Sequence, residues 1–337
     1  MSSPVSERPQ FAYLVLSHKD AKDVETLADR ILELSPCARI VVHHDARAGA
    51  APWAGEPPAP IHLVERGEVS WGDWSMIEAT LRLLRYGVER TDADWFVLLS
   101  GEHRPAVDLE AWEVTTVASG SDALLPARRL PGRVRFGTRA AEDNEYLARS
   151  RHRWSLVARP RQPAAQRAMG LLMKLSRHVR PVLSIEYVHR RDSWAVGRFR
   201  RAGVMKERAF YRGSQWFALN RRSATAALTV DPATKEWFTR SWIPDETYLQ
   251  TALRGDPSLL IADTPTTFVL DTPEKPFPGW MQLSDADLPA VHASGLPFAR
   301  KVDPINRPEV VARLDEAADR QRDALPTRKD GRPRTLK

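Results

Sequence analysis

The chain has 337 residues, of which 42% are hydrophobic and 28% charged, with a formal net charge of +7. This composition is ordinary for a soluble globular protein and excludes a chain too polar to build a core. No run approaches the roughly 18 apolar residues of a membrane span, and the first residues lack the apolar core of a signal peptide, so we expect a cytoplasmic protein.

The first third of the chain predicts an α/β sheet. A polar lead, 1–9, precedes the first element. Short apolar runs predict strands at 11–16, 38–43, 61–64 and 95–99, and apolar positions at helical spacing predict helices at 21–34 and 75–88. This alternating order indicates a mostly parallel sheet, with the strand at 95–99 buried on both faces. The single cysteine, Cys37, cannot form an internal disulfide, and we expect it to be buried near a strand start.

Polar residues follow three of these strands. They are Ser17 and His18 after the first, His44 and Asp45 after the second, and 100–103 after the strand at 95–99. Ligands of such sheets bind at the carboxyl ends of the strands. Each polar end alone is most simply a solvated loop, but the three together favour a binding site.

The regular pattern breaks at 120–212, where one amphipathic helix is predicted at 164–179. Later segments predict a strand at 213–219, helices at 223–228 and 244–253, and strands at 259–261 and 268–270. We therefore divide the chain into a nucleotide-binding half, 10–119, and an acceptor and catalytic half, 120–318. The second half includes an Arg-rich insertion, 147–212, expected to be helical, and a basic disordered tail, 319–337, follows it.

The Arg-rich stretch has three interpretations: a solvated face, a surface that meets an anionic membrane, or a wall for an acidic acceptor. A basic amphipathic helix fits peripheral contact with an anionic membrane, although a solvated face is the simplest interpretation. Aromatic residues in and beside this stretch are too widely spaced for a nucleic-acid groove, so we expect no nucleic-acid partner.

Two neighbouring motifs indicate chemistry on a sugar. The run 213–216 (GSQW) and the helix start 244–246 (PDE) place a carboxylate beside an aromatic floor, which suits a sugar and proton abstraction from a hydroxyl. The alternative is that Glu246 has no catalytic role and lies in a first helical turn because the helix dipole stabilises an acid there. Trp216 would then be a core residue. Asp245 is expected mainly to orient the turn.

In order along the chain, several stretches resemble the core-2/I-branching N-acetylglucosaminyltransferases and the related peptide O-xylosyltransferases, in their bacterial form. The matching stretches are 12–19 (AYLVLSHK), 41–45 (VVHHD), 69–75 (VSWGDWS) with Glu78 and Ala79, 96–101 (FVLLSG) with Pro105, 213–216, 244–246, and 298–301 (FARK). The resemblance covers about residues 11–303. It implies a GT-A fold, a UDP-sugar donor, inversion at the anomeric carbon and no metal.

The resemblance also implies residue roles. Glu246 matches the general base, Asp45 the acid that contacts uracil, and Lys301 a base that binds the diphosphate. A second phosphate-binding Arg is expected where this chain has Phe268, so that role is unassigned and Arg300 is a candidate. The remaining expected donor contacts are Ser17 and His18, and the acceptor or sugar pocket is expected to include Trp71, Trp74, Glu102, Glu145, Ser214, Gln215, Trp216 and Asp245.

Alternatives stay open at several of these positions. Trp71 and Trp74 could pack on the nucleotide sugar or cover the sheet edge. Arg300 and Lys301 could be a surface basic pair. Glu102 and His103, which stands where family members have Asp, could ligate a metal, although an isolated pair rarely does so.

Many GT-A enzymes hold a metal ion through an Asp-x-Asp string that follows a central strand. Two such strings occur in this chain, at 92–94 and 285–287. The first precedes its strand and the second lies in a polar loop, so neither is expected to do so. The sequence therefore predicts a metal-independent, inverting glycosyltransferase without a cofactor. Its donor is a UDP-sugar, first UDP-N-acetylglucosamine and next UDP-xylose, and its acceptor a hydroxyl of a glycan or glycoside. The alternative is a non-catalytic carbohydrate- or nucleotide-binding protein of the same fold.

Overall fold

The computed structural model describes residues 9–132, 141–176, 178–179, 182–188, 192–200, 205, 208–270 and 281–324. Residues 1–8 of the predicted lead and 325–337 of the predicted tail lie outside the described residues. The tail was predicted to begin at 319, but 319–324 are helical, because they continue α10 (Pro308–Ala324).

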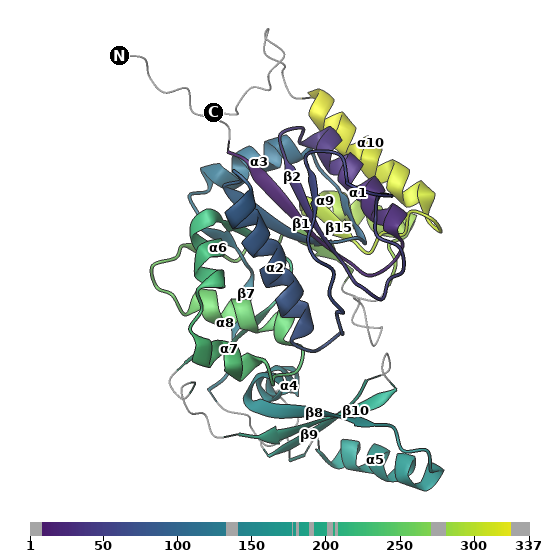
Figure 1. The fold of residues 1–337 in the computed structure, drawn as a ribbon, viewed down its shortest axis with the longest axis vertical. Coiled ribbons are helices and arrows are strands. Elements are labelled where there is room, and N and C mark those ends of the chain that lie inside the picture. The colour runs from purple at the N-terminus through teal and green to yellow at the C-terminus, as the bar shows by residue number, and fades with distance from the viewer. Residues whose placement is uncertain are drawn as a thin grey trace.

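A seven-stranded sheet forms the centre of the molecule (Figure 1), with the strand order β13-β6-β12-β4-β1-β2-β3. β1 is parallel to β2 and β4, and β2 is parallel to β3, whereas β12 is antiparallel to β4 and β6. The predicted mixed α/β fold with a mainly parallel sheet is confirmed. The strands are β1 (Phe11–Ser17), β2 (Arg39–His44), β3 (Ile61–Leu63), β4 (Trp95–Ser100), β6 (Ala123–Leu124), β12 (Ala218–Asn220) and β13 (Ile261–Ala262).

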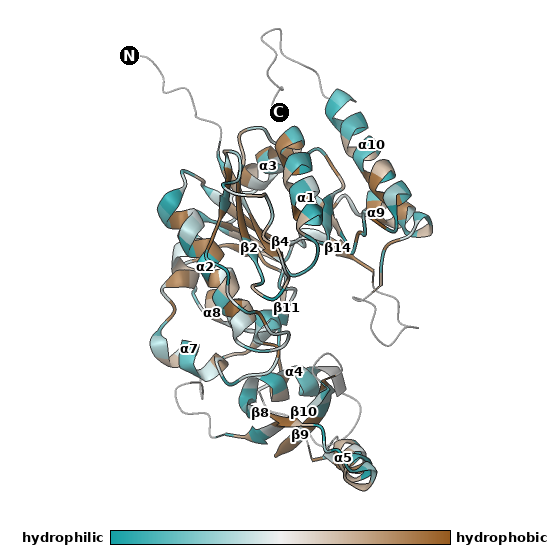
Figure 2. Ribbon diagram, turned by 45° about the vertical axis from the view of Figure 1, so that its right-hand side comes forward, coloured by the Kyte–Doolittle hydropathy of each residue, from teal (hydrophilic) through white to brown (hydrophobic). Residues whose placement is uncertain are grey.

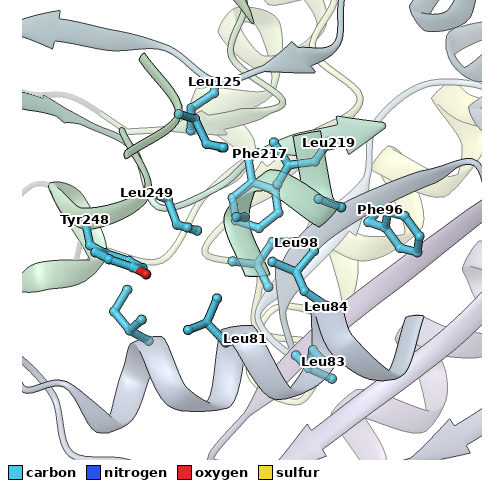
Figure 3. Close-up of a cluster of buried hydrophobic side chains, with 14 of the residues drawn as sticks. Leu81, Leu83, Leu84, Phe96, Leu98, Leu125, Phe217, Leu219, Tyr248 and Leu249 are labelled. Atoms are coloured by element: carbon cyan, nitrogen blue, oxygen red, sulfur yellow. The ribbon is translucent and has the colours of Figure 1, made fainter. Parts of the chain in front are cut away.

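Helices cover both faces of this sheet, because its central strands are apolar on both sides. Alternate residues of β1 enter two separate cores: Leu14 packs in one and Tyr13 in the other. Figure 3 shows the first core, where Leu81 and Leu84 of a helix meet Leu98 of β4. The helices of the first core include α2 (Ser75–Arg90), α6 (Arg221–Leu228), α7 (Pro232–Phe238) and α8 (Tyr248–Arg254), and those of the second include α1 (Ala21–Leu34) and α3 (Leu109–Ala118).

A second, three-stranded sheet joins the C-terminal part of the chain to the end of β4. β15 (Phe298–Arg300) lies between β14 (Thr267–Val269), to which it is parallel, and β5 (His103–Pro105), to which it is antiparallel. In the register of this pairing Arg300 faces His103. Residues far apart in sequence are thereby brought to the carboxyl end of β4. The helices α9 (Leu288–Ser294) and α10 pack their apolar faces against this sheet.

A layer of three antiparallel strands forms the end of the molecule farthest from α10 (Figures 1 and 2). We call this set of elements the distal layer; it follows α4 (Ala141–Arg151) and comprises β8 (His152–Ala158), α5 (Pro163–Ser176), β9 (Leu183–Val188) and β10 (Ser193–Phe199). The prediction of a helical insertion was therefore wrong, because α5 is only one part of a small sheet. Three strands and a helix with their own apolar contacts can form such a layer without a large core.

One face of the distal layer packs on the body of the molecule. Trp154 stacks against Trp242 with ring centroids 6.0 Å apart. On β10, Gly197 lies under Trp154, where a Cβ atom would come within 2.6 Å of the indole ring. A glycine is required here because only a residue without a side chain lets the ring lie on the strand.

Three local predictions were wrong. The strand at 213–219 is two strands, β11 (Tyr211–Gly213), which pairs with β7 (Ala127–Arg129), and β12, which pairs with β4. The helix at 244–253 is a 3-10 turn, Pro244–Glu246, followed by α8, because Thr247 has an extended φ of −141°. Cys37 is exposed, because it lies in the turn between α1 and β2.

The seven-stranded sheet draws β6, β12 and β13 from beyond residue 119. Strands from both predicted halves of the chain thus belong to one sheet. The assignment of one half to the nucleotide and of the other to the acceptor stays a prediction. No helix in the described part of the chain has the length and apolar character needed to cross a bilayer.

Candidate functional site

A cavity of about 500 Å³ opens where β1, β2 and β4 end. Ser17 ends β1, Asp45 follows β2 and Ser100 ends β4, so the three polar strand ends of the sequence meet at this cavity. The carboxyl ends of parallel strands lie at the same edge of a sheet, which explains why these three polar segments lie together. The lining also includes His18, His43, Arg47, Ser70, Trp71, Met76, Glu102, Gln215, Trp216, Asp245, Glu246, Arg300 and Lys301.

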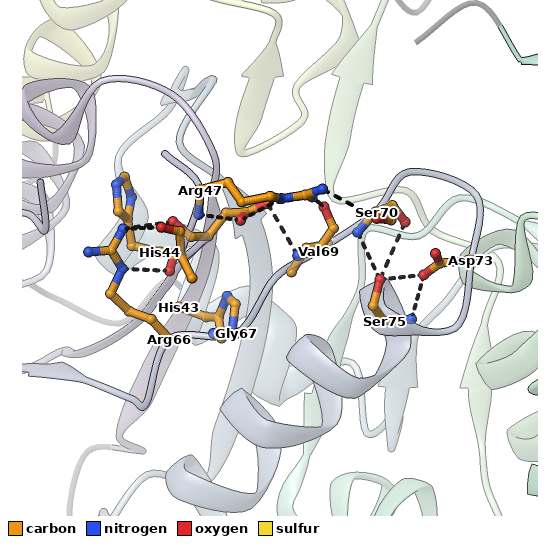
Figure 4. A network of polar contacts seen from close by, with 11 residues as sticks. His43, His44, Arg47, Arg66, Gly67, Val69, Ser70, Asp73 and Ser75 are labelled. Atoms are coloured by element: carbon orange, nitrogen blue, oxygen red, sulfur yellow. Dashed lines mark hydrogen bonds and ion pairs between the residues drawn. The ribbon is translucent and has the colours of Figure 1, made fainter. Parts of the chain in front are cut away.

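Asp45 is held by a dense set of hydrogen bonds, whose donors Arg47, Arg66 and Val69 are labelled in Figure 4. Its carboxylate accepts from the backbone N–H of Arg47 at 2.9 Å, from that residue's guanidinium at 3.2 Å and from the N–H of Val69 at 3.2 Å. Burial would raise the pKa of Asp45, but the hydrogen bonds from Arg47 and Val69 lower it below its ordinary value. Arg66 binds the carbonyl of Asp45 at 2.8 Å, which fixes the backbone beside it. An ionised, rigid carboxylate therefore lies at one side of the cavity.

The loop after β3 brings Trp71 to the cavity. Gly72 has a φ of +79°, and its carbonyl accepts from the N–H of Ile243 at 2.9 Å. The ring of Trp242 lies 3.0 Å from where a Cβ of Gly72 would be, and it meets Trp71 edge to face at 5.9 Å. The loop is thus fitted against the turn that carries Asp245. Trp74 does not line the cavity, contrary to prediction, because it is buried against Tyr248 in the core.

Three basic side chains gather around Glu102. Its carboxylate accepts from Nζ of Lys19 at 2.5 Å and lies 3.6 Å from Nη2 of Arg300 and 3.6 Å from Nζ of Lys301. Burial would raise the pKa of Glu102, but the hydrogen bond from Lys19 and the charges of Lys301 and Arg300 lower it. Glu102 lines the cavity, where it is the shared counter-ion of three cations.

Arg300 is further oriented by an aromatic ring. Its guanidinium lies 4.8 Å from the ring centroid of Trp216, within cation–π range, and its Nε donates to Ser100 Oγ at 3.3 Å. Lys301 is buried, with only about a tenth of its side chain exposed. A basic surface is therefore fixed where the cavity meets β15.

His103 turns away from the cavity that Glu102 lines. Its Nδ1 accepts from the N–H of Ser100 at 2.9 Å, and its Nε2 lies 3.3 Å from Thr267 Oγ1. Because a backbone N–H can only donate, Nδ1 is the acceptor and the proton is on Nε2. Burial, with the nearby charge of Arg300, lowers the pKa of His103 well below its ordinary value, so the ring is neutral.

The 3-10 turn Pro244–Glu246 brings two adjacent carboxyl groups to the cavity. Burial, with the charge of Glu246, raises the pKa of Asp245 to about 7. Burial also raises the pKa of Glu246, while the charge of Arg149 opposes this rise. Two neighbouring acids with raised pKa values are typical of sites that move protons near neutral pH.

Behind Glu246, α4 supplies a buried cation. Nη1 of Arg149 lies 3.7 Å from Oε2 of Glu246, and Arg149 also pairs with Glu145 and Glu186. Burial and Glu246 raise the pKa of Tyr146 to about 12, so that its hydroxyl keeps its proton. Glu145 was predicted to lie in the acceptor pocket, but it does not line the cavity and instead helps to hold Arg149.

The GSQW run forms another part of the lining. Gln215 and Trp216 line the cavity, and the Trp216 ring meets that of His103 at 4.5 Å. Ser214 does not line it, because its hydroxyl accepts from the N–H of Trp216 and its carbonyl from Gln250. The structure thus brings together every predicted site residue except Trp74, Glu145 and Ser214.

Among the residues around this site that the sequence did not indicate are three cations, Lys19, Arg47 and Arg149. Lys19 closes the matched stretch 12–19 and Arg47 follows Asp45 by two residues, so proximity in sequence could have indicated both. Arg149 had no such signal, because its link to Glu246 spans almost a hundred positions and depends on the packing of α4.

Neither Asp-x-Asp string lines the cavity. Asp94 accepts from the N–H of Gln10 at the amino end of β4, and Asp287 caps its own turn through Ser284. Across the part of the chain that the structure describes, His, Cys, Asp and Glu side chains form no group of three suited to a metal ion.

Comparisons with known proteins do not identify a family for this chain. No protein-family model and no curated protein matches the sequence. Among solved structures, the chain is similar to a Bacillus anthracis protein described as a glucose-1-phosphate thymidylyltransferase in complex with a sucrose, at 7% identity and a TM-score of 0.30, over 66% of this chain and 77% of that one. A score of this size carries no argument about fold or function.

Proposed function

We propose that this chain is an inverting, metal-independent glycosyltransferase of the GT-A type, related to the core-2/I-branching N-acetylglucosaminyltransferases and peptide O-xylosyltransferases. Its donor is a UDP-sugar, first UDP-N-acetylglucosamine, and its acceptor a hydroxyl of a glycan or glycoside. The observation that carries the proposal is the make-up of one cavity, whose lining combines the acids Asp245 and Glu246 with the bases Arg300 and Lys301.

The acids suit the acceptor side of the reaction. In the proposed step Glu246 takes the proton of the acceptor hydroxyl, and the freed oxygen attacks the anomeric carbon from the face opposite the leaving group. The raised pKa of Glu246 makes its ionised form a stronger base, and the charge of Arg149 favours that ionised form. Asp245, which is buried beside it, takes part in the same titration.

The bases suit the departing diphosphate. As the bond between the anomeric carbon and the diphosphate oxygen breaks, UDP leaves with the electron pair and gains negative charge. Arg300 and Lys301, held in place by Glu102 and Trp216, offer fixed positive charge to stabilise it without a metal. Asp45, at the end of β2, is the proposed contact to uracil.

The proposal is tested by incubating the purified chain with a panel of UDP-sugars and simple glycoside acceptors and measuring UDP release. We expect acceptor-dependent release with at least one donor, and inverted anomeric configuration in the product. Binding of UDP-sugars without release under any acceptor would favour the non-catalytic alternative, and no binding of any UDP-sugar would overturn the proposal.

A further inference from the structure

The outer face of α5 carries an apolar stripe. Leu171, Leu172 and Leu175 are 58%, 46% and 52% exposed, and their spacing puts them on one side of the helix. Beyond the helix, Val179 and Val182 are 43% and 62% exposed. Scattered surface leucines need no explanation, but a contiguous apolar stripe of this kind marks an interaction surface.

This stripe is not the packing face of the helix. α5 contacts β9 with its other side, where Ser176 is buried and its hydroxyl accepts from the N–H of Ile185 at 3.1 Å. Met169 and Met173, which lie on that side, are partly buried. The leucines are therefore additional apolar surface that the fold itself does not use.

Basic side chains flank the stripe. Arg167 and Lys174 are both exposed and lie seven residues apart, on one line along α5. Positive charge thus lies beside the apolar stripe on the outer face of α5.

Acidic side chains do not balance this charge. Between 152 and 200 the sequence has only two acids, Glu186 and Asp192. Glu186 accepts from Trp242 Nε1 at 3.0 Å, on the face toward the body of the molecule, and Asp192 pairs with Arg159 at 2.9 Å. A surface of exposed leucines flanked by Arg167 and Lys174, in a segment with few acids, is complementary to the headgroups and upper acyl chains of anionic lipids.

We propose that the distal layer docks on an anionic lipid surface through the outer face of α5. A second copy of the chain fits less well, because a two-fold contact would set Arg167 and Lys174 of one copy close to those of the other. A nucleic acid fits less well, because the stripe consists of leucines, and Trp154 and Trp194 in the strands are buried.

Docking would also orient the cavity. The inner face of the same layer reaches the cavity through Trp242, which contacts Trp154 on one side and cavity-lining Trp71 on the other. A chain of packed tryptophan rings thus links the distal layer to the cavity. The docking proposal does not depend on the reaction proposed above.

The test is co-sedimentation of the full chain with vesicles of phosphatidylcholine alone and with an equal part of phosphatidylglycerol. We expect binding to the anionic vesicles only, weakened by salt. The triple change Leu171→Gln, Leu172→Gln, Leu175→Gln should weaken binding roughly tenfold or more, because three apolar side chains no longer enter the lipid. Arg167→Glu with Lys174→Glu should weaken it similarly.

The matched control is Leu260→Gln with Ile305→Gln, which removes apolar side chains that are 65% and 64% exposed outside the distal layer. We expect this control to bind as the natural chain does, and far-ultraviolet circular dichroism verifies that all variants are folded. Equal losses in control and triple variant, or no binding to anionic vesicles, would overturn the proposal. So would a concentration-dependent dimer that the triple change abolishes, or binding to single-stranded RNA in preference to vesicles.

Discussion

Arg149 lies with its Nη1 3.7 Å from Oε2 of Glu246, so a cation of α4 stands beside the candidate base. Arg149 belongs to α4, directly before the distal layer, and its backbone carbonyl accepts from the N–H of Trp242. Its guanidinium also meets Glu145 and Glu186. The ionisation of Glu246 therefore depends on a cation that Glu145 and Glu186 also hold in place.

Glu246→Gln should abolish sugar transfer while UDP-sugar binding persists. The change removes the carboxylate but keeps the volume, and a general base contributes roughly 10²–10⁴-fold to the rate. Steady-state UDP release measures the loss, and calorimetry measures donor binding. Glu89→Gln is the matched control, because it removes an exposed carboxylate of α2 outside the cavity, and it should leave UDP release unchanged. Turnover of Glu246→Gln within about threefold of the natural chain would contradict the assignment.

Transfer should fall as pH drops through the titration of the Asp245 and Glu246 pair. A base acts only when deprotonated, and the pKa values of both groups are raised, that of Asp245 to about 7. Asp245→Asn removes a negative charge beside Glu246, so the rising limb of the pH–rate profile should move to lower pH. Asp323→Asn changes an exposed residue of α10 outside the cavity and should leave the profile unchanged. A limb that stays in place in Asp245→Asn would mean that the two acids do not interact.

Lys301→Ala should weaken UDP binding much more than uridine binding. A charge-assisted hydrogen bond to a phosphate is worth about tenfold or more in affinity, and uridine has no phosphate to lose it. Arg300→Ala is the comparison at the neighbouring base, and Lys235→Ala, on α7, removes a lysine outside the cavity. Calorimetric titration gives both affinities. Equal weakening of the two ligands would show that Lys301 has a structural role only.

UDP-sugar affinity should be the same with and without EDTA. The reason is that fixed bases lie beside the cavity, whereas both Asp-x-Asp strings lie away from it. The measurement is a calorimetric titration in each buffer, followed by addition of Mn²⁺. If EDTA removed most of the affinity and Mn²⁺ restored it, a metal site would have to be sought around Glu102.

Gly72→Ala should destabilise the fold by about 1–3 kcal/mol more than Gly120→Ala, because its Cβ must displace the ring of Trp242. Both glycines have positive φ values, +79° and +68°, but a Cβ at Gly120 meets open space. The pair therefore separates the steric contact from the backbone strain. Urea unfolding of the two variants gives the difference. Equal losses of stability would mean that the Trp242 ring moves freely.

The sequence was a good guide where the signal is local and strong. The strands β1, β2 and β4 are unbroken apolar runs, because both of their faces are buried, and such runs are easily located. Their polar ends then predicted the place of the cavity, since parallel strands share a carboxyl edge. Asp45, Glu246 and Lys301 were found by motif and do line that cavity.

The sequence was a poor guide where contacts are distant or strands are short. Glu102 was assigned to a sugar pocket because none of its basic partners is near it in the sequence. Lys19 lies far before it, and Arg300 and Lys301 lie almost two hundred residues after it. The strands of the distal layer were hidden among arginines, which interrupt the alternation of apolar residues. Their pairing depends on Gly197 admitting Trp154, a steric requirement that no periodicity reveals.

Cys37, which lies exposed before β2, gives every molecule a single chemical handle. A maleimide dye would attach there and nowhere else. The six residues of β2 separate it from Asp45 by roughly 20 Å, so the dye would sit at the amino end of the strands, away from the cavity. Energy transfer from that dye to a labelled bilayer would measure how far this edge of the sheet is held from the lipid, and hence the angle at which the molecule stands on it.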